Sequence, residues 1–352
     1  MISLYDMLEA ADGQLFGEAA AHIFTDFAFE LSQVEPGCLF VALKSERGDG
    51  HQLIAAAVER GALGVICTQP PGVPTDNVTV MIVREAEQAL LNWARIVMQK
   101  YGTAVIAVTG AIGKSTTAAA IAAVLSTRYN VYTSTRGGIG RLGLPLALGR
   151  LGQQHELAVL ELATEQSGEM DELMEIVHPL VSVVTGSHIP DTWPGEQEHL
   201  ADELASLVSH LPDDGIAVLN YDDPGVRGLE ERTRASVFSY GIDSFDADLI
   251  AYNIVIGRYK TGFDLRYAGE RFVGKWVPLL GRHQLFNVMA ALAVGLSYQV
   301  PMEDGLRALT QVDPLPGRMR PLNGVGGSLL IDDTYSASEQ STIAALEWLG
   351  SV

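Results

Sequence analysis

Residues 103–128 read TAVIAVTGAIGKSTTAAAIAAVLSTR, and this stretch decides the fold of the chain. Its first seven residues are β-branched or apolar and predict a buried strand. Glycines at 110 and 113 interrupt the strand, and an alanine-rich helix is predicted to begin near Ser115. A strand, a glycine loop and a helix in this order indicate an α/β protein with a ligand at the loop.

The loop has the composition of a phosphate-binding loop, although its glycines are two residues closer than in the commonest P-loop pattern. Backbone N–H groups of such a loop surround phosphate oxygens, and the helix N-terminus adds the positive end of its dipole. Lys114 can reach the β- and γ-phosphates, and Ser115 can bind Mg²⁺. An ordinary turn with a surface lysine is the alternative, but the flanking strand and helix favour a nucleoside triphosphate. The residues predicted to bind it are Gly110, Ala111, Ile112, Gly113, Lys114, Ser115 and Thr116.

Composition narrows the class of protein. The chain has 352 residues, 47% of them hydrophobic, which predicts two domains and a fragment of a third. A formal net charge of -20 argues against a nucleic-acid partner or an anionic membrane surface. Cys38 and Cys67 lie in apolar runs and are predicted to be buried free thiols. No stretch approaches the ~18 apolar residues of a membrane span, so we expect a cytoplasmic protein.

The order of predicted elements divides the chain into three parts. Residues 1–98 predict a small α/β domain, and residues 99–315 predict a doubly wound, mostly parallel sheet flanked by helices. Within the second part, residues 235–280 are rich in β-branched residues and predict antiparallel hairpins added to that sheet. Residues 316–352 begin a third α/β domain. Its helix has apolar residues that need cover from the body of the protein, a partner or a missing domain: Ile343, Leu346, Trp348 and Leu349.

Two further segments carry polar residues that could bind ligands. Glu161 ends the predicted strand HELAVLELAT at 155–164, on the sheet edge where ligands gather in parallel α/β proteins. We favour a magnesium ligand over a glutamate that only faces solvent. The polar loop at 44–51 is equally consistent with a binding segment and with an ordinary solvated loop.

Several segments, in collinear order, resemble the Mur ligases of peptidoglycan synthesis, and most closely their MurF type, which adds D-alanyl-D-alanine to a UDP-linked muramoyl peptide. The resemblance covers nearly the whole chain, and several of its motifs are weak alone. The segments are FVALKSERGDGH (40–51), VTGAIGKSTT (108–117), LPLAL (144–148), VLELAT (159–164), VLNYDDP (218–224), GRHQLFNVMAALA (281–293), LPGRMR (315–320) and LIDDTYSAS (330–338).

The resemblance implies an ATP- and Mg²⁺-dependent ligase in which ATP phosphorylates a carboxylate and an amine attacks the resulting acyl phosphate. It assigns catalytic roles to Lys114, on the phosphates, and to Glu161, which would share Mg²⁺ with Ser115. His283 and Asn287 would lie near the nucleotide base. A UDP-sugar peptide is the implied small-molecule substrate, and its pocket would be lined by Lys44, Asp49 and His51.

The sequence also departs from the family pattern. The carbamylated lysine that bridges to a second magnesium in Mur ligases has no counterpart, because the chain has no lysine between Lys114 and Lys260 and the aligned position lies near Leu204. The family histidine would fall near Asp191, and the resemblance offers His188 as a candidate substitute metal ligand. The first-domain triplet DSR reads Asp26, Phe27, Ala28, so its aspartate is kept and its serine and arginine are replaced.

Three hypotheses therefore stay open at this point: a MurF-like ligase, a catalytically impaired Mur-like scaffold or regulatory protein that binds nucleotide, and a P-loop NTPase of another kind. A P-loop NTPase of another kind would leave the other collinear motifs unexplained. The first has the support of the fold, the nucleotide site and the first domain together.

Overall fold

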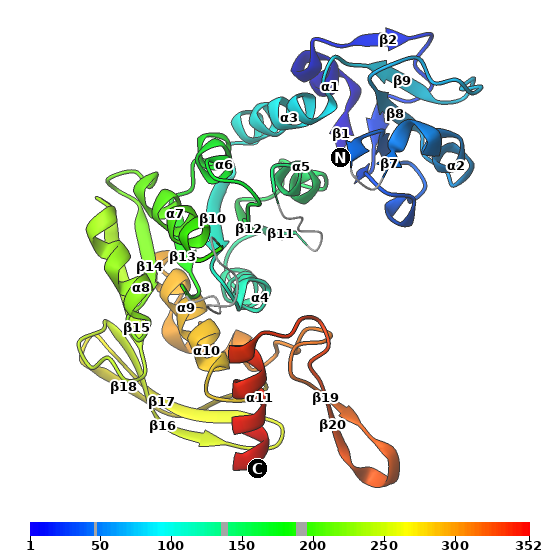
Figure 1. Cartoon of the computed structure of the whole chain (residues 1–352). Helices are drawn as coiled ribbons and strands as arrows, with labels where there is room; N and C mark the ends of the chain where they lie inside the picture. The colour runs from blue at the N-terminus through cyan, green and yellow to red at the C-terminus, as the bar shows by residue number, and fades with distance from the viewer. Residues whose placement is uncertain (46–47, 135–139, 188–195) are drawn as a thin grey trace. The chain divides into compact units, whose positions relative to one another are not determined.

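A computed structural model describes residues 1–45, 48–134, 140–187 and 196–352 (Figure 1). The chain forms two compact units, and each is made of three separate stretches of the sequence. The first contains Met1–Thr103, Ser134–His155 and Leu162–Val177, and the second contains Ala104–Thr133, Glu156–Glu161 and His178–Val352. This division does not test the predicted domains, which stay a prediction: 1–98, 99–315 and 316–352.

The first unit is built on a five-stranded sheet in the order β2-β9-β8-β5-β4. β4, β5, β8 and β9 are parallel, and β2 pairs antiparallel with β9. β5 and β8 are wholly buried, which explains why their sequences are unbroken apolar runs. The strands are β2 (Gln14–Phe16), β4 (Phe27–Ala28), β5 (Leu39–Val41), β8 (Gly64–Cys67) and β9 (Thr79–Ile82), and the short pairs are β1 (Ile2–Ser3) with β3 (Ile23–Phe24) and β6 (Lys44–Ser45) with β7 (Gly48–Asp49).

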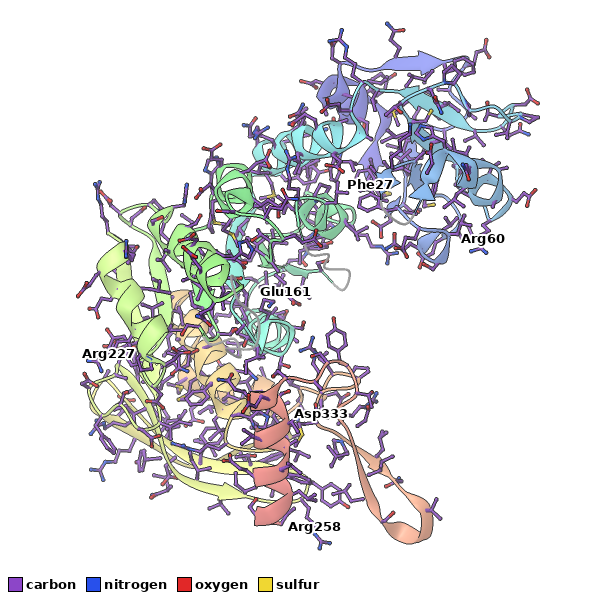
Figure 2. The ribbon with its side chains drawn as sticks, viewed as in Figure 1. Phe27, Arg60, Glu161, Arg227, Arg258 and Asp333 are labelled. Atoms are coloured by element: carbon purple, nitrogen blue, oxygen red, sulfur yellow. The ribbon has the colours of Figure 1, made fainter. Side chains whose placement is uncertain are left out.

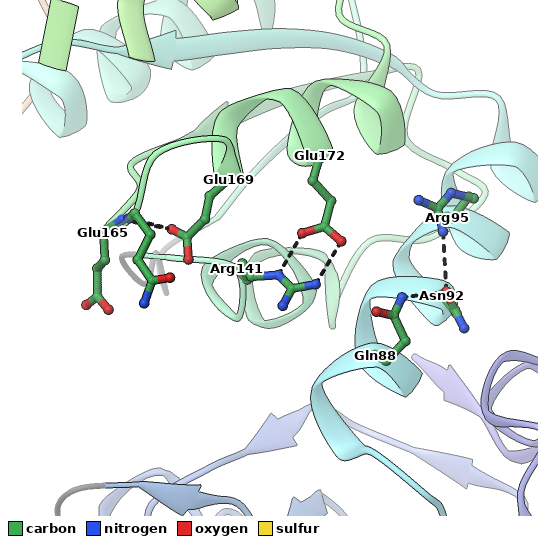
Figure 3. A network of polar contacts seen from close by, with 8 residues as sticks. Gln88, Asn92, Arg95, Arg141, Glu165, Glu169 and Glu172 are labelled. Carbon is green, nitrogen blue, oxygen red and sulfur yellow. Dashed lines mark hydrogen bonds and ion pairs between the residues drawn. The ribbon is translucent and has the colours of Figure 1, made fainter. Parts of the chain in front are cut away.

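Helices complete this unit. α3 contacts α1, α5 and α6. Its Trp93 is 1% exposed and meets the ring of Phe27 edge-on, with centroids 4.7 Å apart. Arg141 donates two hydrogen bonds to Glu172, of 2.6 and 2.8 Å, and so fastens the loop before α5 to α6 (Figure 3). The helices are α1 (Leu4–Ala11), α2 (Ile54–Glu59), α3 (Ala86–Tyr101), α5 (Gly143–Leu148) and α6 (Glu169–Val177).

The second unit is built on a nine-stranded sheet in the order β11-β12-β10-β13-β14-β15-β16-β17-β18. Every pair from β11 to β16 is parallel, and the last three strands are antiparallel. β11 and β18 are the two edge strands, and the β17–β18 register shifts between Phe263 and Leu265. The strands are β10 (Ala104–Thr109), β11 (Val131–Thr133), β12 (Leu157–Glu161), β13 (Val181–Val184), β14 (Ile216–Asn220), β15 (Ser236–Gly241), β16 (Leu249–Ile256), β17 (Thr261–Tyr267) and β18 (Glu270–Val277).

The helices of this unit pack on the sheet as expected for a doubly wound α/β protein. α4, α9 and α10 contact one another, and they share a core with the apolar side chains of the sheet. α7 packs against β10 and β13. These helices are α4 (Lys114–Leu125), α7 (Glu196–Ser209), α8 (Pro224–Arg227), α9 (Gln284–Ser297) and α10 (Met302–Leu309). The predicted fold class is therefore confirmed.

One prediction for this sheet is wrong in part. We expected the strands of residues 235–280 to be antiparallel, but β15 is parallel to β14 and β16 is parallel to β15. The segment between β14 and β15 contains α8 and a 3₁₀ helix at Gly228–Arg232. This connection is long enough to bring the chain back to the end of the sheet where β14 begins, so that β15 runs in the same direction. Antiparallel pairing begins only at β17.

The last residues form a small hairpin and a helix. β19 (Arg320–Asn323) pairs antiparallel with β20 (Leu329–Asp332), and α11 spans Glu339–Ser351. Trp348 is 3% exposed, packs with Leu280 and Met319, and donates to the carbonyl oxygen of Gly257 at 3.3 Å. The other apolar residues of this helix named above are 48–62% exposed. The expected docking on the body of the protein is thus made mainly by Trp348, with Ala345 packed against the same cluster.

Both cysteines are buried free thiols, as predicted. Burial raises the pKa of Cys67 to about 11. None of the helices in the described ranges is long and apolar enough to cross a membrane.

Candidate functional site

The glycine loop lies at the switch point of the nine-stranded sheet. The chain leaves β10 for β11 on one side of the sheet and leaves β13 for β14 on the other, although β10 and β13 are neighbours. Open α/β sheets bind ligands at the carboxyl ends of the strands at such a point. The loop follows β10, and Thr185 and Gly186 follow β13.

Two glycines give the loop its shape. Gly110 has φ 135° and Gly113 has φ 89°, in the left-handed region that side chains disfavour. A Cβ at Gly110 would collide with the hydroxyl of Thr185 and lie 2.9 Å from the amide nitrogen of Gly186. A Cβ at Gly113 would lie 2.8 Å from Oδ1 of Asn287. The loop therefore needs glycine at both positions.

Contacts with the end of β13 hold the loop in place. Thr185 Oγ1 donates to the carbonyl oxygen of Ile112 at 2.5 Å, and the amide of Ala111 donates to the carbonyl oxygen of Gly186 at 2.9 Å. The Ala111 amide is thus bonded within the protein, although we predicted that it would face phosphate. Helix α4 begins at Lys114, and the amide of Thr117 donates to Gly113 at 2.9 Å. The amides of its first turn precede the first helical hydrogen bond and suit an anion.

Lys114 is half-buried beside the loop. Its Nζ donates to the carbonyl oxygen of Gly110 at 2.6 Å. Burial lowers the pKa of Lys114, while the carboxylates of Glu203 and Glu161 act in the opposite direction. The ammonium therefore lies in a desolvated place where two negative charges stabilise it.

Ser115 and Glu161 meet at the start of α4. Ser115 Oγ donates to Glu161 Oε2 at 2.7 Å, and Arg318 Nη2 donates to the same hydroxyl oxygen at 2.9 Å. Glu161, labelled in Figure 2, is the last residue of β12. The structure thus brings together two of the three residues that were predicted to hold a metal, and the third, His188, lies outside the described residues.

The residues fit a magnesium ion bound with a nucleotide. In the ranges that the structure covers, no three His, Cys, Asp or Glu side chains form a cluster that could hold a metal alone. Mg²⁺ commonly takes one or two protein oxygens and completes its shell with phosphate oxygens and water. The Ser115 hydroxyl and the Glu161 carboxylate supply such a partial set beside the loop that would hold the phosphates.

Arg318 was not selected from the sequence, although the LPGRMR segment that contains it is among those that resemble Mur ligases. Two hydrogen bonds fix this segment: the amides of Gly317 and Met319 donate to the carboxylates of Asp332 and Asp333, each at 3.0 Å. The Arg318 guanidinium also stacks 4.1 Å above the ring of Tyr335. The signal that could have identified it is an arginine next to the predicted turn glycine.

His283 and Asn287 lie at the start of α9. Asn287 Oδ1 accepts from Thr117 Oγ1 at 2.9 Å and its Nδ2 donates to Gln284 Oε1 at 2.8 Å, so its amide joins α9 to the first turns of α4. Burial lowers the pKa of His283. Asn287 is therefore adjacent to the loop, and the predicted contact of both residues with a base stays a prediction.

The predicted sugar-binding residues lie in the first unit. The ring of His51 is 8% exposed, and its Nε2 accepts from the amide of Thr68 at 3.1 Å. Its proton is therefore on Nδ1, which donates to Asp49 Oδ1 at 2.6 Å. Hydrogen bonds from the His51 amide and ring lower the pKa of Asp49. His51 thus fastens its own loop, while Lys44 remains 66% exposed in its side chain. Ligand binding by these three residues stays a prediction.

The departures from the family pattern can also be located. Leu204, at the position aligned with the family lysine, is 1% exposed. Asp26 is 2% exposed and accepts from Arg150 Nε at 2.7 Å. His188 lies outside the described residues.

Comparison with known proteins identifies the family. A model of the Mur ligase middle domain matches residues 108–295, more than half of the chain. A UDP-N-acetylmuramoyl-tripeptide--D-alanyl-D-alanine ligase of Bacillus subtilis (strain 168) is 30% identical over 323 residues, or 91% of this chain and 69% of that protein. The chain belongs to the Mur ligase family.

Solved Mur ligase structures agree with this assignment. A MurF crystal structure from Acinetobacter baumannii superposes with a TM-score of 0.85 at 25% identity, and covers 99% of this chain and 76% of that one. MurF of Thermotoga maritima, in complex with ADP, has a TM-score of 0.74 at 26% identity, with coverage of 93% and 74%. The Mur ligase resemblance drawn from the sequence is confirmed, and the middle-domain match contains the glycine loop, Glu161 and Asn287.

Proposed function

We propose that this chain is an ATP-dependent ligase of peptidoglycan synthesis that joins the carboxylate of a UDP-muramoyl-peptide substrate to D-alanyl-D-alanine. The observation that carries the proposal is the arrangement of Lys114, Ser115 and Glu161 around one glycine loop at the sheet switch point. The choice of substrates is supported by the name of the Bacillus subtilis relative and by the MurF structures. The impaired-scaffold alternative rests on the absent family lysine, whose position is taken by Leu204, and the ligase relatives do not favour it.

Positioning and charge neutralisation are the main demands of this reaction. The substrate carboxylate attacks the γ-phosphorus of ATP, ADP leaves, and the amine then attacks the acyl phosphate carbon with loss of inorganic phosphate. The Lys114 ammonium and the first-turn amides of α4 would stabilise negative charge on the phosphoryl oxygens, as preorganised donors do. Magnesium, held by Ser115 and Glu161, would neutralise further charge on the phosphates. Arg318 would add a third positive group, since it already reaches Ser115.

Phosphate release tests the proposal. We expect release from ATP only when Mg²⁺, a UDP-muramoyl tripeptide and D-alanyl-D-alanine are all present. ATP with Mg²⁺ should also raise the melting temperature of the chain. Lys114→Ala should abolish both effects because it removes the charge beside Gly110.

The matched control is Lys260→Ala, which removes an exposed lysine outside the loop and should change neither effect. Equal thermal shifts in the wild type and in Lys114→Ala would contradict the nucleotide site. A thermal shift without phosphate release would instead favour the scaffold alternative.

A further inference from the structure

Glu203 is a buried carboxylate next to the phosphate loop that the proposed reaction does not use. It lies on α7, which contacts β10 and β13, and is 7% exposed. Its Oε1 accepts a hydrogen bond of 2.6 Å from Thr109 Oγ1, and Thr109 is the last residue of β10, directly before Gly110. Its Oε2 lies 3.9 Å from Nε2 of His199.

Glu203 lies at the start of the loop, because the residue that donates to it, Thr109, directly precedes Gly110. Its carboxylate also acts to raise the pKa of Lys114, against the effect of burial. The loop thus has one carboxylate that shares a hydrogen bond with the candidate metal-binding hydroxyl and a second that is bonded to the strand behind it. A low-dielectric site strengthens both the attraction and the repulsion that such a carboxylate exerts.

A buried negative charge at a polyphosphate site repels the ligand unless a cation accompanies it. At neutral pH, free ADP has about three negative charges and its magnesium complex about one, so the carboxylate opposes the free form much more strongly. On the basis of the proposed nucleotide site, we propose that Glu203 is a specificity-determining residue that makes the phosphate loop reject metal-free nucleotide and accept the magnesium complex.

The test measures nucleotide affinity rather than activity. Isothermal titration with ADP, in EDTA and in excess Mg²⁺, gives two dissociation constants for each variant. In Glu203→Gln, which loses the charge but keeps an oxygen acceptor for Thr109, metal-free ADP should bind about tenfold more tightly. Binding of the magnesium complex should change less than about twofold. The preference of the protein for magnesium-bound nucleotide therefore falls.

Two other variants complete the test. Glu198→Gln removes an exposed carboxylate from the same helix and should leave both constants unchanged. Glu203→Asp keeps the charge but withdraws it by one methylene, so the magnesium preference should be intermediate; this variant decides the question if Glu203→Gln does not fold.

Three outcomes overturn the inference. If Glu203→Gln weakens both forms of ADP equally, Glu203 only supports the fold of the loop. If it leaves both constants unchanged, or if Glu203→Asp, which keeps the charge, loses the magnesium preference as fully as Glu203→Gln, charge at this position does not select the ligand. Failure of the wild type to bind magnesium ADP would instead refute the proposed function, and this inference with it.

Discussion

At the scale of single residues, the geometry of Gly113 links the stability of the loop to its ligand. Its φ of 89° requires a left-handed backbone, and a Cβ there would lie 2.8 Å from Asn287 Oδ1. Asn287 in turn accepts from Thr117 on α4. A substitution at Gly113 therefore strains the loop and displaces the amide that joins α9 to α4.

We expect Gly113→Ala to lower the free energy of unfolding by about 1–3 kcal/mol and to weaken nucleotide binding. Urea unfolding and ADP titration measure the two effects. Gly102→Ala is the control, because Gly102 also has positive φ, 62°, but its Cβ would meet no atom within 4 Å. Equal affinity for ADP in the two variants would contradict the role given to Gly113.

The same scale shows what a sequence can reveal about a site. Lys114, Ser115 and Glu161 were found because a glycine loop and a strand end define their positions along the chain. Arg318 was missed because its approach to Ser115 depends on hydrogen bonds from its neighbours to Asp332 and Asp333, which no local pattern shows. The internal bonding of His51 was also out of reach, since it needs the amide of Thr68 from another strand end.

At the scale of elements, α11 is attached to the body of the second unit mainly through Trp348. That side chain is 3% exposed, while Leu346 on the same helix is 61% exposed. The helix also has a capping box at Ser338, which fixes where it begins. Its attachment therefore depends on one large buried ring more than on the length of its apolar face.

Trp348→Ala should release α11, because substitution of a buried tryptophan by alanine costs about 3–5 kcal/mol. Hydrogen exchange of the α11 amides should then approach the rate of an unfolded peptide. Leu346→Ala is the matched control and should leave exchange unchanged. Fast exchange in both variants, or in neither, would argue against this mode of attachment.

The sequence predicts where helices and strands lie along the chain better than it predicts how the strands pair and in which direction they run. The parallel core was predictable because apolar strands alternate with amphipathic helices from β10 to β14. The direction of β15 was not predictable, since it depends on whether the segment between β14 and β15 crosses the sheet. The Gly and Asp turns of this region favoured antiparallel hairpins, but β15 is parallel to β14. β19 was missed because RPLN has no strand pattern and is held by pairing with β20.

At the scale of the whole molecule, the described contacts of the phosphate loop come from the second unit. Thr185, Asn287, Glu161 and Arg318 all belong to it. ADP with Mg²⁺ should therefore slow amide exchange around residues 108–118, 156–161 and 315–320 and leave residues 1–103 unchanged. Mass spectrometry of exchanged peptides measures this distribution. Protection of equal size in residues 1–103 would show that nucleotide binding also involves the first unit.

The edge of the nine-stranded sheet affects how the protein behaves at high concentration. An exposed edge strand offers unpaired backbone groups to another chain, and long flat edges promote fibre growth. β18 is such an edge, but it has Glu270, Arg271 and Lys275 along its length, a left-handed Gly274 with φ 66°, and an irregular register with β17. A second copy that paired along β18 would need to match the same bend and the same charges. The edge thus ends the sheet within one molecule and opposes templated aggregation.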